Sequence, residues 1–114
     1  MMGFAQPDTD ITVTKTTSGI LALKGSDAKI ESINPCIHCG ACIRACPRAY
    51  LPTLISEAVE QNADGQELAA LYAQYCFECG CCAYVCPAKR PLLQHCKLAK
   101  QKALAYLRAK TAAN

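Results

Sequence analysis

The strongest constraint on this chain is a run of cysteines that occurs twice. Each copy has the spacing C-x2-C-x2-C-x3-C-P, in residues 36–47 and again 40 positions later in residues 76–87. This spacing is typical of bacterial proteins with two iron–sulfur clusters, in which the fourth cysteine of each run binds the cluster of the other run. The sequence therefore predicts two [4Fe–4S] clusters and a fold that holds the two runs close together.

The crossed pattern assigns four cysteine ligands to each cluster. The first cluster is predicted to bind Cys36, Cys39, Cys42 and Cys86. The second is predicted to bind Cys76, Cys79, Cys82 and Cys46. Two more cysteines, Cys81 and Cys96, lie outside the pattern. We expect them to behave as small apolar side chains, with a role as substitute ligands as the lesser alternative.

Ten cysteines in 114 residues are also compatible with a disulfide framework or with zinc. The first residues have neither the basic region nor the apolar core of a secretory signal, which argues against disulfides. Zinc prefers paired C-x2-C units, which argues against the second alternative. No apolar run is long enough to span a membrane. Eight free thiolates therefore indicate a reducing, cytoplasmic compartment.

We expect a mainly α fold, namely an α-helical ferredoxin-like two-cluster domain over residues 35–110, preceded by an N-terminal arm over residues 1–34. Residues 11–15 alternate apolar and polar side chains, and residues 20–23 could return beside them. This alternation predicts an extended or β-ribbon arm. A two-stranded ribbon is only marginally stable by itself, so the arm is expected to pack against a partner.

The 29 residues between Cys46 and Cys76 leave room for two short helices. Pro52 is well placed to open the first, which runs to Glu60. The second is predicted over residues 66–75, after a turn at Asp64-Gly65. A last helix is expected from Leu92 to about residue 109. The predicted apolar faces are Leu54, Ile55, Ala58 and Val59; then Leu68, Leu71, Tyr72 and Tyr75; then Leu92, Cys96, Ala99, Ala103 and Tyr106.

Tyr72 and Tyr75 are predicted to lie in the core, with electron relay as the less favoured alternative. His38 and Glu78 occupy equivalent positions in the two runs. Each either tunes its cluster or is a simple exposed side chain. Gly40 and Gly80 are expected to be required by the backbone, so that amide groups can approach the cluster sulfurs.

Charge is distributed unevenly along the chain. Residues 1–78 carry five Lys and Arg against nine acids, a balance of −4, whereas residues 79–114 carry seven Lys and Arg and no acid. Such a split suggests a docking surface. The basic last helix is either a solvated face or a contact with an acidic partner or anionic lipid heads.

The sequence resembles the C-terminal ferredoxin domain found in the C subunit of the Rnf ion-translocating oxidoreductase complex. The resemblance extends to about residue 108, with His38 where the family usually has Arg and Cys81 where it has a small residue. The stretches that carry it are residues 1–5, 16–23, 36–42, Cys46-Pro47, Leu51-Pro52 and 76–87.

The resemblance implies an electron-carrying component that is not catalytic alone. The family's large portion associated with flavin and NADH has no match here, and no glycine-rich nucleotide fingerprint is present, so no flavin or NAD site is expected. Partners would be the other subunits of a membrane redox complex and redox proteins such as ferredoxin, with no nucleic acid. The implied location is peripheral, on the cytoplasmic face of the bacterial inner membrane. The alternative is a soluble iron–sulfur adaptor of the heterodisulfide-reductase or glycolate-oxidase type.

Overall fold

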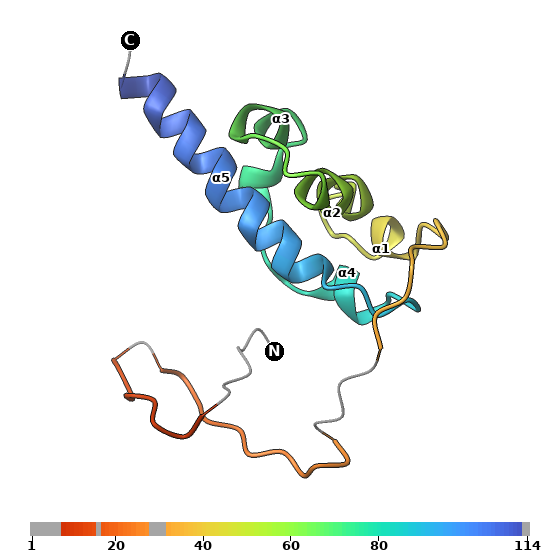
Figure 1. Cartoon of the computed structure of the whole chain (residues 1–114), viewed down its shortest axis with the longest axis vertical. Coiled ribbons are helices and arrows are strands. Elements are labelled where there is room, and N and C mark those ends of the chain that lie inside the picture. The colour runs from red at the N-terminus through yellow and green to blue at the C-terminus, as the bar shows by residue number, and fades with distance from the viewer. Residues whose placement is uncertain (1–7, 16, 28–31, 113–114) are drawn as a thin grey trace. The chain divides into compact units, whose positions relative to one another are not determined.

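The structure is a computed structural model that describes residues 8–15, 17–27 and 32–112. The chain divides into two units, one within residues 3–32 and one from residue 33 onward. All helices of the described residues lie in the second unit (Figure 1). In chain order they are α1 (Ala41–Arg44), α2 (Pro52–Glu60), α3 (Gly65–Ala70), the 3-10 helix η1 (Ala73–Tyr75), α4 (Cys81–Tyr84) and α5 (Leu92–Ala112). The predicted mainly α class is confirmed.

The two cysteine runs fold alike. Gly40 and Gly80 adopt left-handed φ angles of 70° and 81° and start the short helices α1 and α4. Each run is followed by a further left-handed residue, Ala49 in one copy and Lys89 in the other. The chain then enters the helix that begins at Pro52 in the first copy and at Leu92 in the second. The repeat in the sequence is therefore a repeat of structure, up to the first turns of α2 and α5.

Helix α2 begins and ends where the sequence predicts. Pro52 occupies its first turn, where a missing N–H costs no hydrogen bond. Ile55 and Val59 are buried, and Ala58 packs against them, but Leu54 is exposed. The predicted apolar face is thus correct except at Leu54.

The helix predicted over residues 66–75 is interrupted. Asp64 caps α3 by accepting a hydrogen bond from the Glu67 amide at 2.8 Å, so Gly65 is the first helical residue and not part of a turn. Tyr72 then adopts a left-handed φ of 58° and separates α3 from η1. The break turns Tyr72 and Tyr75 outward, with 61% and 56% of their surfaces exposed. The prediction that these tyrosines belong to the core is wrong, although Leu68 is fully buried.

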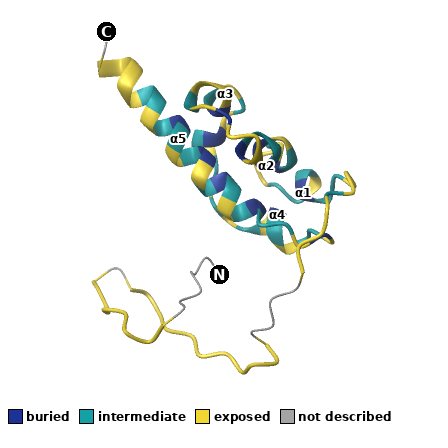
Figure 2. Cartoon of the chain, viewed as in Figure 1, coloured by how far each residue is buried: buried dark blue, intermediate teal, exposed yellow. Residues whose placement is uncertain are grey.

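Helix α5 forms one wall of the core and contacts α2, α3, η1 and α4. Its buried residues are Leu92, Cys96, Ala99 and Ala103, which are four of the five positions of the predicted seam; the fifth, Tyr106, is half-buried. Figure 2 shows these buried positions along α5, with exposed residues toward its C-terminal end. Ala99 and Ala103 pack with Ile55 and Leu68. A smaller cluster of Cys42, Cys82 and Leu92 joins the two runs.

The first unit contains no β-strand among residues 8–15 and 17–27. The predicted ribbon of residues 11–15 and 20–23 is therefore absent from the described residues, and this segment has only the turns at Thr14–Thr17 and Lys24–Asp27. Thr16 and residues 1–5, which contribute to the family resemblance, lie outside the described residues. Val13, Ile20, Leu21 and Leu23 are exposed.

Candidate metal centres

Two cavities bring the eight predicted ligands together in crossed sets. We call the first site 1; its walls contain Cys36, Cys39, Cys42 and Cys86, and it encloses about 330 Å³ of empty space including its mouth. We call the second site 2; its walls contain Cys46, Cys76, Cys79, Cys82 and also Cys96, around about 450 Å³. Each site thus combines three cysteines of one run with the fourth cysteine of the other run.

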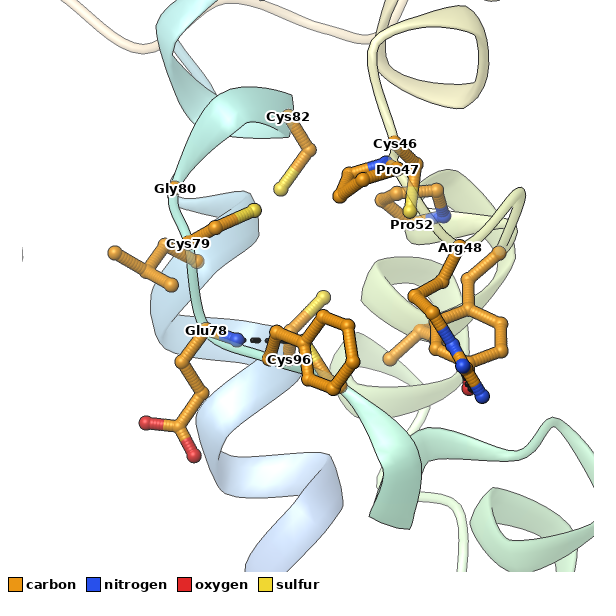
Figure 3. A pocket seen from close by; sticks show the side chains of 14 residues that line it. Cys46, Pro47, Arg48, Pro52, Glu78, Cys79, Gly80, Cys82 and Cys96 are labelled. Carbon is orange, nitrogen blue, oxygen red and sulfur yellow. Dashed lines mark hydrogen bonds between the residues drawn. The ribbon is translucent and has the colours of Figure 1, made fainter.

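Figure 3 shows how site 2 is assembled. Cys79 and Cys82 project from the segment around α4, and Cys46 projects from the opposite wall with Pro47. Pro52 and Ile55 close the wall from α2, while Leu93 and Cys96 close it from α5. Most of the lining is apolar. Several thiols, which are soft ligands, in such a wall suit an iron–sulfur cluster.

The loop backbone is shaped to support thiolates. His38 and Glu78, which follow the first cysteine of each run by two residues, adopt left-handed φ angles of 52° and 57°. Their amides donate to the Cys36 Sγ and Cys76 Sγ atoms, each at 3.4 Å. Gly40 and Gly80 supply the turn into each helix, and the expectation that they let amide groups approach the cluster sulfurs stays a prediction. Amide donors of this kind stabilise negative charge on sulfur.

Site 1 has its own polar neighbours. The Thr53 Oγ1 lies 3.8 Å from the Cys42 Sγ, and either atom can be the donor. Arg90 lines the site and pairs with Glu60, which raises the pKa of Arg90. His38 is exposed, and its Nδ1 lies 3.9 Å from the Glu57 carboxylate.

Site 2 has different neighbours, and they include a lysine of the basic helix. The Lys100 Nζ donates to the Glu78 carboxylate at 2.8 Å and to the Cys76 carbonyl at 2.9 Å. Arg48 stacks over the Phe77 ring, with 5.2 Å from its Cζ to the ring centroid. Lys100 is therefore part of the scaffold of site 2 and not of a solvated face, and Glu78 is held in an ion pair.

The thiols of site 2 influence one another. Interaction with the Cys96 thiol lowers the pKa of Cys76 to about 6 and that of Cys82 to about 7. The same two neighbours raise the pKa of Cys96, and burial adds to the effect. Cys96 thus stays protonated while its neighbours favour the thiolate form, which is the form that binds metal.

Cys81 differs from Cys96 in its surroundings. It is exposed, it lines neither cavity, and interaction with the Cys79 side chain raises its pKa. Among the described residues, no three His, Cys, Asp or Glu side chains are close enough to hold a single metal ion, and this includes the cysteines of both sites. Four thiols spread around a cavity fit a [4Fe–4S] cluster, which takes one thiolate at each corner.

Sequence reasoning missed several residues around the sites: Arg48, Thr53, Arg90 and the scaffold role of Lys100. Each of these residues contacts a group at least 11 positions away in the sequence. Cysteine spacing does not predict such contacts. The one available signal was the repeat itself, since residues 40 apart line equivalent parts of the two cavities, as Pro47 and Pro87 do.

Comparison with protein families finds a similarity over the region that contains the eight cysteines of the two runs. Residues 35–89 match the family model described as a 4Fe-4S dicluster domain. Within residues 8–15, 17–27 and 32–112, the structure has no helix with the length and hydropathy of a transmembrane span.

Curated proteins show a similarity over a region of comparable length. The chain is 48% identical over 62 residues to the C subunit of the Na(+)-translocating ferredoxin:NAD(+) oxidoreductase complex of Acetobacterium woodii, a match that covers 54% of this chain and 14% of the relative. It is 45% identical over 56 residues to the C subunit of the proton-translocating ferredoxin:NAD(+) oxidoreductase complex of Clostridium ljungdahlii, covering 49% and 12%. For the C subunit of the ion-translocating oxidoreductase complex of Rhodobacter capsulatus, identity is 38% over 52 residues, covering 46% and 10%. The chain spans about a seventh or less of the length of these relatives.

Proposed function

We propose that this chain transfers electrons through two [4Fe–4S] clusters, because residues 35–89 match the family model of a 4Fe-4S dicluster domain and the chain is similar to C subunits of ion-translocating ferredoxin:NAD(+) oxidoreductase complexes. It would do so as the ferredoxin-like part of such a subunit. The chain's own residues hold, insulate and position the clusters, and the clusters when bound supply one-electron carriers. On this proposal the chain relays electrons and completes no reaction alone.

The proposed ligands are Cys36, Cys39, Cys42 and Cys86 in site 1, and Cys46, Cys76, Cys79 and Cys82 in site 2. The observation that carries this proposal is the crossed lining of the two cavities. Amide donors at Cys36 and Cys76 would offset the negative charge that thiolates and clusters bring. Since α1 and α4 contact each other, the crossed ligands would also lock the two runs into one unit.

The relatives' names also support a place for the chain in a larger assembly. They describe subunits of complexes that couple ferredoxin and NAD(+) to translocation of an ion. We propose that this chain works with such subunits as a peripheral component at the cytoplasmic face of the membrane. Nucleotide chemistry and ion movement would then belong to partners.

The test is the metal content of protein reconstituted under anaerobic conditions, followed by spectroscopy of two mirrored variants. Two complete sets of four thiols predict about eight iron and eight sulfide per chain. Cys46→Ser should change the signals of site 2 and leave site 1, and Cys86→Ser should do the reverse. Cys81→Ser is the matched control and should change neither.

Two results would contradict the proposal. One is saturation at four iron, or binding of zinc in place of iron. The other is a Cys46→Ser spectrum in which only the cluster of the neighbouring Cys36, Cys39 and Cys42 is altered, since this would mean that each run completes its own site.

A further inference from the structure

The repeat makes one difference between the two sites visible. A shift of 40 positions pairs Ser56 of α2 with Cys96 of α5, and both are almost fully buried, at 1% and 2% exposure. The Ser56 Oγ is hydrogen-bonded to the His95 Nδ1 at 2.7 Å and does not line site 1. Cys96 lines site 2. Site 2 thus has a fifth thiol where site 1 has none.

The fifth thiol is held firmly in place. Cys96 lies in the first half of α5, within the buried seam that packs against Ile55 and Ala73. One turn later, Lys100 ties the same helix to the Cys76 carbonyl and to Glu78. Figure 3 shows Cys96 below Cys79 and Cys82, in the wall of the same cavity. The thiol lines the same cavity as the side chains of Cys76 and Cys82.

We propose that Cys96 is a positioning residue for site 2, which donates its S–H to the sulfurs of Cys76 and Cys82 and raises the reduction potential of the cluster bound there. This rests on the proposed function, because it takes Cys46, Cys76, Cys79 and Cys82 as the ligands. With four ligands already supplied, the cluster has no open corner for Cys96. An unligated thiol has a proton to donate, if as a weak donor, whereas a thiolate bound to a cluster can only accept.

The direction of the effect follows from charge. Reduction adds negative charge to a cluster and its thiolates, and a donor to sulfur stabilises the reduced form more than the oxidised form. In site 1 the nearest comparable group is Thr53, whose hydroxyl contacts a single sulfur, that of Cys42. Its counterpart 40 positions later is the apolar Leu93, which lines site 2. Site 2 has no donor at the position equivalent to Thr53, and Cys96 supplies one from another position. On this inference, Cys96 makes site 2 a better electron acceptor than it would be without the thiol.

Three variants test this inference: Cys96→Ala removes the donor, Cys96→Ser keeps one in a side chain of similar size, and Cys81→Ala is the control outside both cavities. The measurement is an anaerobic redox titration followed by electron paramagnetic resonance, together with iron content. Cys96→Ala should make the potential of site 2 more negative and shift its electron occupancy several-fold, up to about tenfold, or about 59 mV for one electron. Cys96→Ser should restore most of the potential, and Cys81→Ala should leave both potentials unchanged.

The outcomes are separable. If Cys96→Ala and Cys96→Ser shift the potential equally, or neither shifts it, Cys96 is only a packing residue and the inference is wrong. If Cys96→Ala loses iron from site 2, Cys96 is a ligand and the inference is equally wrong. The proposed function fails independently, when the unaltered chain holds fewer than eight iron.

Discussion

Single residues with a left-handed backbone shape both cysteine loops. His38 and Glu78 share this conformation although their side chains have opposite chemistry, and the common element is the amide that each donates to sulfur. The sequence could predict which cysteines gather around each cavity, because cysteine spacing is specific. It could not predict these turns, because glutamate is uncommon at positive φ and histidine, although enriched there, adopts it only in a minority of cases. The two runs therefore repeat a backbone conformation at positions where their residues differ.

Gly80 gives the first prediction at this scale. Its φ is +81°, which costs a residue with a Cβ roughly 1–2 kcal/mol, while its surroundings alone would tolerate a methyl group 3.6 Å from Leu93. Gly80→Ala is therefore expected to lower the free energy of unfolding by about 1–2 kcal/mol, measured by urea unfolding of the cluster-loaded protein without oxygen.

Gly25 is the control for that experiment. Nothing lies within 4 Å of a Cβ built there, and its backbone is outside the left-handed region. Gly25→Ala should change stability by no more than about 0.5 kcal/mol. Equal effects of the two substitutions would mean that the turn before α4 carries no conformational constraint.

Helices α3 and α5 approach each other more closely than their sequences indicate. A Cβ at Gly65 would come within 2.6 Å of the Tyr106 Cβ and 2.7 Å of the Lys102 carbonyl oxygen. Sequence reasoning assigned Gly65 to a turn, because Asp-Gly is a strong turn signal, and it could not detect the contact because Tyr106 is 41 residues away. By contrast, the start of α2 at Pro52 and the seam of α5 were predictable, since a proline and a periodic apolar pattern are local signals.

Gly65→Ala is the second prediction. The methyl group would press on backbone rather than on a flexible side chain, so α3 must move away from α5. Overpacking of this kind typically costs about 1–3 kcal/mol. The expected result is a lower urea midpoint with unchanged iron content, because the contact lies away from both cavities. A midpoint within the range of Gly25→Ala would show that α3 and α5 are not packed this closely.

Fewer of the positive side chains of α5 are available for docking than the sequence implies. Lys100 is bound within site 2, and the Lys102 Nζ donates to the Ala63 carbonyl at 3.5 Å. Arg108 and Lys110 are exposed near the end of α5. Counting charges predicted a basic helix correctly, but the division between structural and surface lysines depends on tertiary contacts that composition does not encode.

The third prediction concerns this exposed end. If α5 contacts an acidic partner protein, changing Arg108 and Lys110 together to Gln should weaken binding several-fold at low salt and reduce its dependence on salt. Exposed charges are screened within roughly 8 Å at physiological ionic strength. The measurement is binding to isolated partner subunits across a salt series, with the charge-preserving exchange Arg108→Lys and Lys110→Arg as control. Unchanged binding in the Gln variant would leave the end of α5 as a solvated surface.

The crossed sites also set an order of events during biosynthesis. A ribosome delivers Cys36 first, yet with the proposed ligands site 2 receives its fourth thiol only with Cys82, and site 1 only with Cys86. Both sites therefore become complete within five residues of each other, and only once the second run has been made. A nascent chain that ends between the two runs would carry an unfinished set of reactive thiols, so on this proposal iron is loaded late and into both sites at nearly the same time.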